Sequence, residues 1–136
     1  MPAHSDKFPW SSYYGHYRKL ETLLKGHSKV DGLDKLADGL YNLTLKNQKT
    51  LKLFIGECYS FGIAEFHEVT DNHGDIDIVL ISSAWCGYGY DVKHYCRNQN
   101  IGVFQIGDFM AALNRRNLSQ YLNEDETKYF EEQGWV

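Results

Sequence analysis

The chain has 136 residues, of which 43% are hydrophobic and 24% are charged, and its net charge is −4. This length suits a single domain with its own hydrophobic core. A transmembrane helix needs about 20 consecutive apolar residues, and since no run approaches that length we expect no membrane association. The three cysteines, Cys58, Cys86 and Cys96, lack the paired spacing of a zinc site, so we expect reduced thiols in a cytoplasmic protein.

Charge is unevenly distributed along the chain. Residues 17–52 hold eight Lys or Arg against four acids, residues 93–116 hold four against one, and residues 124–132 are strongly acidic. A negative net charge argues against a nucleic-acid partner. For binding to a phosphate backbone, however, the local clustering of basic residues matters more than the net charge of the chain. Arg97, Arg115 and Arg116 are the candidate phosphate contacts.

The N-terminal third reads as helical. Residues 1–12 contain both prolines and suggest a loose arm, and apolar residues at helical spacing predict a helix over 13–25. Similar spacing between Leu33 and Leu43 predicts a second helix, opened by Asp31 or Asp34. We therefore expect one domain over 1–136, with a helical N-terminal extension over 1–46 and a core over 47–136.

The middle of the chain changes from a helical period to a strand period. Residues 50–61 read as a third helix with Glu57 at the edge of its apolar face, and Gly62 ends it. Strands are predicted over 63–69, 75–81 and 87–95, with turn residues over 70–74. The strand over 75–81 is apolar on both faces after Asp77, which favours a central position.

The last third predicts a helix that starts at 103 or 108 and ends at 116, then a short strand over 118–122. A final helix opens in residues 123–126 and stops at Gly134. The predicted order is α-α-α-β-β-β-α-β-α, which is an α/β fold.

One acidic constellation suggests chemistry. Between Leu53 and Val92 there are seven carboxylates and no Lys or Arg. If the strands carrying Asp77 and Asp91 form a hairpin, these two carboxylates approach each other and can bind Mg²⁺ or Mn²⁺. Lys93 shares a strand face with Asp91 and would hold a phosphate or the attacking water, and Glu57 would complete the metal shell.

The same residues resemble the PD-(D/E)xK nuclease superfamily. The resemblance lies in the helix with Glu57, the run Gly74 to Leu80, the run Tyr90 to Tyr95, and the segment Ile101 to Leu113, which is similar to the Mrr-like restriction endonuclease branch. It implies a restriction-endonuclease-like α-β-β-β-α-β core over about residues 48–122, with the predicted helical hairpin before it. By position, Asp77 and Asp91 take the places of the metal-binding acids, Lys93 that of the lysine, and Glu57 that of the helix carboxylate.

What the resemblance implies is a Mg²⁺-dependent endonuclease, a hydrolase that acts on phosphodiester bonds in DNA, in restriction, defence or repair. Relatives usually act as dimers, so we expect a homodimer or a partner subunit. Two alternatives stay open. One is a nucleotidyltransferase-type enzyme that uses Asp75, Asp77 and Asp91, and the other is a non-catalytic nucleic-acid-binding domain or subunit on the nuclease fold. Lys93 could also form only a structural salt bridge with Asp77 or Asp91.

Overall fold

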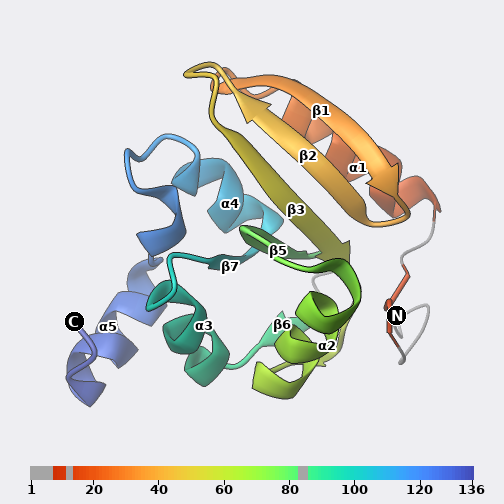
Figure 1. Cartoon of the computed structure of the whole chain (residues 1–136). Helices are drawn as coiled ribbons and strands as arrows, with labels where there is room; N and C mark the ends of the chain where they lie inside the picture. Colours follow the sequence, from red (N-terminus) through yellow and green to blue (C-terminus); the bar gives the residue numbers. More distant parts are fainter. Residues whose placement is uncertain (1–7, 12–13, 83–85) are drawn as a thin grey trace.

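The computed structural model describes residues 8–11, 14–82 and 86–136. It is a mixed α/β fold built on a five-stranded sheet with the strand order β1-β2-β3-β5-β7 (Figure 1). The strands of this sheet are β1 (Val30–Ala37), β2 (Leu40–Leu45), β3 (Thr50–Gly56), β5 (Ile78–Ile81) and β7 (Gly102–Gln105). The helices are α1 (Tyr14–Lys25), α2 (Ile63–His73), α3 (Tyr90–Arg97), α4 (Ile106–Ala112), α5 (Glu124–Gln133) and the 3-10 turn η1 (Leu118–Gln120). A separate two-stranded sheet joins β4 (Ser60–Phe61) to β6 (Gly87–Tyr88).

The sheet changes from antiparallel to parallel at β3. The strands β1, β2 and β3 form an antiparallel meander, whereas β3 pairs with β5, and β5 with β7, in parallel. Because parallel neighbours need a crossover, α2 connects β3 to β5 and α3 connects β5 to β7. The β2–β3 turn therefore lies at the amino-terminal edge of the three parallel strands, and Glu57 lies at their carboxyl edge.

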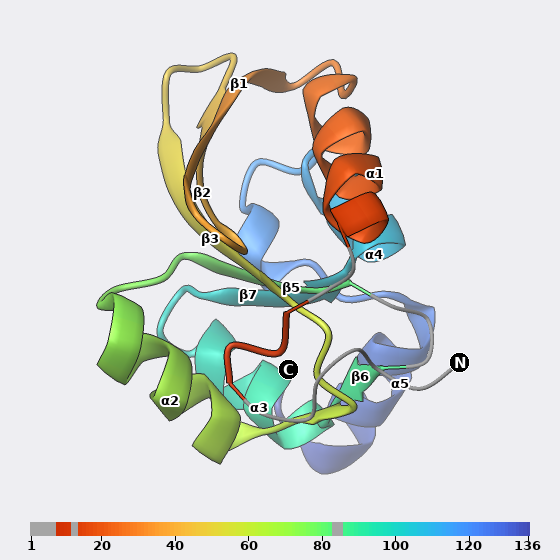
Figure 2. The ribbon, with the colours of Figure 1, turned by 90° about the vertical axis from the view of Figure 1, so that its right-hand side faces the viewer.

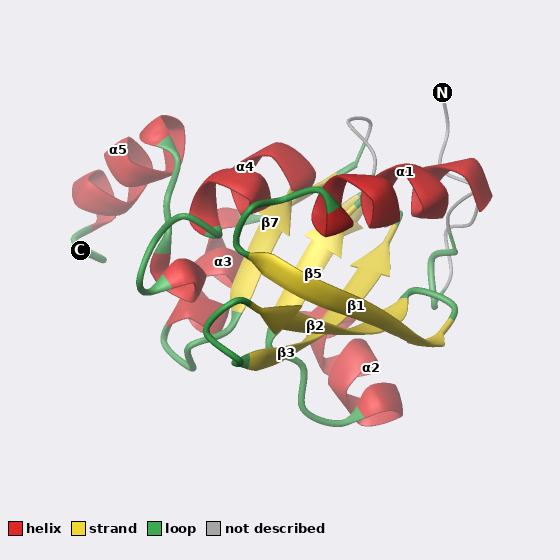
Figure 3. Ribbon diagram, turned by 90° about the horizontal axis from the view of Figure 1, so that it is seen from above, coloured by secondary structure: helices red, strands yellow, loops and turns green. Residues whose placement is uncertain are grey.

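The helices cover both faces of the sheet. One hydrophobic cluster holds α1 and α4 against the sheet, and the other holds α2 and α3 against the opposite face (Figures 2 and 3). Along β5 the side chains alternate between these clusters, since Ile78 and Leu80 belong to the first and Val79 and Ile81 to the second. The central position predicted for this strand is confirmed.

The helices at the two ends of the chain are also confirmed. In α1, Leu20 and Leu24 are buried at the predicted spacing. Before α5, the Asn123 side chain accepts a hydrogen bond from the backbone N–H of Glu126 at 2.8 Å, and Gly134 ends the helix with φ +72°. Strong caps made this short polar helix predictable.

The predicted second helix is wrong, because its residues form β1 and β2. A two-residue turn, Asp38-Gly39, joins these strands, and Gly39 has φ +78°. Since both strands belong to the same sheet as β3, residues 1–46 are not a helical hairpin. In the expected N-terminal arm, Trp10 is buried against Phe54 and Phe61, and residues 1–7 and 12 lie outside the described residues.

Five further elements differ from the prediction. The expected helix over 50–61 is mainly β3, and the expected strands over 63–69 and 87–95 are mainly α2 and α3. The expected helix over 103–116 is divided between β7 and α4, and the expected strand over 118–122 is η1. Each segment is short enough for its apolar residues to fit both periods, so periodicity alone did not distinguish a helix from a strand.

From α1 to β5 the observed order is α-β-β-β-α-β, with the two-residue β4 before α2. This order spans residues 14–81 instead of the expected 48–122. In the part of the chain that the structure describes, no helix has both the length and the apolar character of a bilayer-spanning segment.

Candidate functional site

Asp77 lies directly before β5 and holds three strands in register. Its Oδ2 accepts a hydrogen bond from the backbone N–H of Lys52 at 2.8 Å. Its own N–H donates to the Lys52 carbonyl at 2.9 Å, and its carbonyl accepts from the N–H of Gly102 at 3.0 Å. The side chain is otherwise exposed. Asp77 is therefore a strand-end residue, and one of its carboxylate oxygens makes a structural hydrogen bond to the neighbouring strand.

Asp91 lies in the first turn of α3 and not in a strand, which corrects its predicted setting. It is exposed, and its Oδ1 accepts a hydrogen bond from the adjacent N–H of Val92 at 2.9 Å. Gln99 and Asn100, which follow the C-terminal end of α3, border the same hollow as Asp77. Eight helical residues span about 12 Å, so Asp77 and Asp91 lie at opposite ends of α3.

Lys93 is also on α3, and its side chain is fully buried. Two residues on a strand share a face, but on a helix they lie about 200° apart, so Lys93 points away from Asp91. Its Nζ donates to the Val103 carbonyl at 2.6 Å and lies 3.8 Å from the centre of the Phe104 ring. Burial lowers the pKa of Lys93 to about 8, against the attraction of Glu126.

The ionic partner of Lys93 is Glu126 at the start of α5, and not the predicted Asp77 or Asp91. The Lys93 Nζ lies 3.8 Å from Glu126 Oε1, and the Tyr88 hydroxyl donates to Glu126 Oε2. Burial, together with this hydrogen bond, raises the pKa of Tyr88 far above its ordinary value. This network fastens α5 to α3, β6 and β7, which is a structural role.

Glu57 follows β3 at the carboxyl edge of the sheet and is 2% exposed. His16, in the first turns of α1, lies with its Nδ1 3.0 Å from Glu57 Oε1. The backbone N–H of Glu57 donates to the Trp10 carbonyl at 2.8 Å. Glu57 is therefore part of a buried contact between the N-terminal segment and β3, and Asp77 lies beyond the opposite edge of the sheet.

The predicted magnesium ligands thus occupy three separate places. Asp75 and Asp77 border one open hollow, whereas Asp91 and Glu57 do not, so the nucleotidyltransferase set of Asp75, Asp77 and Asp91 is also not assembled. Among the described residues, no group of three His, Cys, Asp or Glu side chains could hold a metal ion. The described donors do not fit the predicted Mg²⁺ site.

Cys58, Cys86 and Cys96 are buried, and none of them forms a disulfide bond within the described residues. Burial raises the pKa of the Cys58 thiol to about 11 and that of Cys96 to about 12. A thiol that stays protonated at neutral pH is a poor nucleophile. These two residues belong to the hydrophobic cluster that packs α2 and α3 against the sheet.

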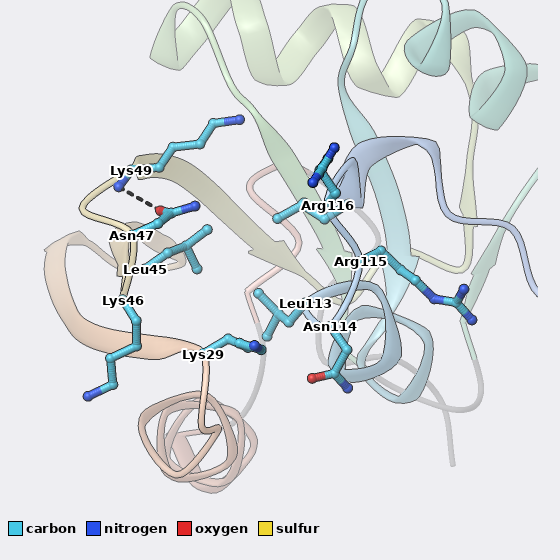
Figure 4. A pocket seen from close by; sticks show the side chains of 10 residues that line it. Lys29, Leu45, Lys46, Asn47, Lys49, Leu113, Asn114, Arg115 and Arg116 are labelled. Carbon is cyan, nitrogen blue, oxygen red and sulfur yellow. Dashed lines mark hydrogen bonds between the residues drawn. The ribbon is translucent and has the colours of Figure 1, made fainter.

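A basic cleft of about 340 Å³ lies at the amino-terminal edge of the parallel strands (Figure 4). Three loops form it: the α1–β1 turn, the β2–β3 turn and the loop after α4. Its described lining contains five cationic side chains and no carboxylate: Lys29, Leu45, Lys46, Asn47, Lys49, Leu113, Asn114, Arg115, Arg116 and Leu118. We call these ten residues the basic cleft.

The walls of the basic cleft are fixed by backbone and side-chain hydrogen bonds. The N–H of Lys46 donates to the Lys29 carbonyl at 2.9 Å, which places two of the turns side by side. His27 Nε2 donates to the Met110 carbonyl of α4 at 3.0 Å, and His27 Nδ1 accepts from the N–H of Lys29 at 3.0 Å. Loops that usually vary are thus anchored to one another and to α4.

The apolar base of the cleft belongs to the hydrophobic core, since Leu45, Leu113 and Leu118 are members of the α1–α4 cluster. In Figure 4 the Lys29 side chain points toward Leu113, whereas Lys49 and Arg116 extend toward the same side of the view. A base of buried leucines surrounded by exposed lysine and arginine side chains is suited to a ligand that lies across the surface.

Few of these cations are neutralised. Lys46 lies 3.6 Å from Asp31, and the Arg115 guanidinium lies 5.5 Å from the centre of the Tyr121 ring. Within the described residues, Lys29, Lys49 and Arg116 have no ion-pair partner. Exposed like charges repel one another unless an anion lies among them.

The two walls of the cleft come from the two basic segments that the charge distribution singles out, residues 17–52 and 93–116. Arg115 and Arg116 are predicted phosphate contacts that the structure places in the cleft. Arg97 is not, because its guanidinium donates to the Gln120 carbonyl at 3.0 Å. Sequence reasoning did not select Lys29, Lys46 or Lys49, although the turn residues around them were a usable signal.

Comparisons of the chain with family models, with curated proteins and with solved structures give no match.

Proposed function

We propose that this domain binds a nucleic acid through the basic cleft. The observation that carries the proposal is a cleft lined by five cations and no carboxylate on a chain whose total charge is −4. A random placement of the charges of an acidic protein would mix the two signs. A concentration of positive charges in a hollow makes the local electrostatic potential more positive and attracts a polyanion.

The residue types suit a phosphate backbone. Lysine presents a mobile point charge that follows successive phosphates, and arginine offers a planar fork that binds a phosphate with two hydrogen bonds. Contacts of this kind release condensed counterions and provide affinity without sequence specificity. This is the non-catalytic nucleic-acid-binding alternative of the sequence interpretation, with DNA as the first ligand to test.

The direct test is fluorescence anisotropy of labelled DNA and RNA with the wild type and the double variant Lys49→Glu/Arg116→Glu. We expect the variant to lose at least about tenfold in affinity. The matched control is Lys19→Glu/Lys128→Glu, which changes the net charge equally at exposed positions outside the cleft. Equal losses in both double variants would show a general charge effect and contradict a site in the cleft.

A nuclease activity is the second proposal. The observation that favours it is the α-β-β-β-α-β order from α1 to β5, with the predicted site residue Glu57 directly after the third strand. Incubation with supercoiled plasmid, linear duplex, single-stranded DNA and RNA, with Mg²⁺ or Mn²⁺ and with EDTA, tests it. Metal-dependent cleavage that Glu57→Gln abolishes would support the proposal, and undiminished cleavage by that variant would show that Glu57 has no part in the reaction.

Sedimentation of the same samples tests the predicted homodimer.

A further inference from the structure

A smaller polar pocket adjoins the basic cleft. It has a volume of about 110 Å³ and is lined by Lys49, Leu51, Asp77, Ile78, Asn100, Asn117, Leu118 and Ser119. Lys49 and Leu118 line both the pocket and the cleft. A phosphate held by the Lys49 ammonium would therefore have the nucleoside attached to it at the mouth of the pocket.

We infer that the ligand of the basic cleft is a single-stranded nucleic acid, and that one unpaired base enters this adjoining pocket. The inference rests on the proposed function and names the form of its ligand. It covers single-stranded DNA and single-stranded RNA, which offer the same phosphates and the same exposed base edges.

The chemistry of the pocket matches a planar heterocycle. Leu51, Ile78 and Leu118 are buried and provide an apolar wall, against which the face of a base can pack. The polar groups stand around them, which is the arrangement of sites that orient small planar ligands. Unpaired bases are recognised by packing on the ring face and by hydrogen bonds to the edge.

Several polar atoms in the pocket keep hydrogen-bonding capacity. Asn100 Oδ1 accepts from the Ser119 hydroxyl at 2.5 Å, which leaves the Asn100 NH₂ group as a donor. Asp77 Oδ2 accepts from the N–H of Lys52, which leaves Oδ1 as an acceptor. Among the described residues, the Asn117 amide has no hydrogen-bond partner, so it offers both a donor and an acceptor.

The pocket is small. Its volume of about 110 Å³ compares with about 340 Å³ for the basic cleft, so the pocket suits a single ring and not a base pair. In a duplex, moreover, the Watson–Crick edges are already paired and the bases are stacked. The cleft alone would bind either form, but the pocket gains contacts only from a strand with free bases.

The experiment compares three labelled ligands of equal length: a single strand, the same strand with abasic sites, and the duplex. With wild-type protein, we expect the single strand to bind at least about fivefold more tightly than the other two, since base contacts add to the phosphate contacts. Asn117→Ala should remove most of this difference and leave the abasic strand unchanged. Because Asn117 is exposed and makes no capping bond, circular dichroism should show an intact fold. Parallel deoxyribose and ribose strands identify which sugar is preferred.

A second variant, Asn117→Trp, fills the pocket and should give the same loss for the single strand alone. Equal binding of single strand, abasic strand and duplex would overturn the inference, as would an Asn117→Ala variant that weakens all three ligands equally. If Lys49→Glu/Arg116→Glu still reduces binding in that case, the cleft remains the site and only the base pocket fails. If Lys49→Glu/Arg116→Glu leaves the binding of all three ligands unchanged, the proposed function itself is contradicted.

Discussion

The ammonium of Lys93 lies 3.8 Å from the carboxylate of Glu126, and the two side chains are 0% and 1% exposed. These residues are 33 positions apart in the sequence, on α3 and at the start of α5. A buried charge is tolerated only when a partner and hydrogen bonds replace its water. The pair therefore fixes α5 on the body of the domain, and Lys93 acts in folding.

Removal of one partner should be costly. We expect Lys93→Ala to lower the free energy of unfolding by about 3–5 kcal/mol, because Glu126 would remain buried without its cation. The double variant Lys93→Met/Glu126→Gln should lose less, since it removes both charges and keeps the volume. Urea unfolding measures both values. A loss below about 1 kcal/mol for Lys93→Ala would show that the pair contributes little.

The lowered pKa of Lys93 predicts a pH dependence. Its ordinary pKa is 10.5 and its value in the folded protein is about 8. Between these values Lys93 is more protonated in the unfolded chain than in the folded chain, so the contribution of this residue to stability should rise from pH 8 towards pH 10. Above about pH 9 the raised pKa values of Cys58 and Cys96 act in the opposite sense, and above about pH 10 so does that of Tyr88, because these groups ionise first in the unfolded chain.

Urea midpoints at pH 7, 8, 9 and 10 test this dependence. Relative to Lys93→Met, which keeps Cys58, Cys96 and Tyr88, the wild type should gain resistance between pH 8 and pH 10. An unchanged difference between the two proteins over this range would assign the effect to another group.

Two glycines offer a matched pair of substitutions. Gly39 has φ +78°, and a Cβ there would lie 2.7 Å from the Ile55 carbonyl oxygen, whereas nothing lies within 4 Å of a Cβ at Gly107 in α4. Gly39→Ala should destabilise by more than about 1 kcal/mol, and Gly107→Ala should stabilise by about 0.5–1 kcal/mol. Thermal unfolding compares them, and a stabilising Gly39→Ala would contradict the β1–β2 turn described above.

Asp77 gives a prediction that separates a structural role from a metal-binding role. Asp77→Ala should lower stability by about 1–2 kcal/mol, because the N–H of Lys52 loses its acceptor. Asp91→Ala, on the exposed first turn of α3, should change stability by less than about 0.5 kcal/mol. Titration with Mn²⁺ provides the second readout: equal loss of Mn²⁺ binding in both variants would show that the two carboxylates share a metal after all.

The success of sequence reasoning depended on whether a segment carried an unambiguous signal. The helix α5 has a capping box and a C-terminal glycine, and β5 is apolar on both faces, so each was predictable. In β1 and β2, leucines three or four residues apart fit a helix, although Asp38-Gly39 is a hairpin signal. The deciding interaction is the pairing of β2 with β3, which the spacing of the apolar residues does not show.

The same ambiguity determined the predicted site. Asp91 and Lys93 share a face only on a strand, so their assignment to one site failed when the segment proved to be α3. The clustering of basic residues along the chain can be recognised without deciding whether a segment is a helix or a strand. For that reason the two basic segments still indicated a candidate binding surface, and the fold brings them together at Lys29, Lys49 and Arg116.

The salt dependence of single-strand binding tests most directly whether the basic cleft holds a nucleic acid. With three or four phosphate contacts, we predict that log K falls against log salt concentration with a slope of about −2 to −3. In Lys49→Glu/Arg116→Glu, which removes two contacts, the slope should become shallower by about 1.4, and in Lys19→Glu/Lys128→Glu it should stay unchanged. A wild-type slope near zero, or an unchanged slope in the cleft variant, would contradict a nucleic-acid site in the basic cleft.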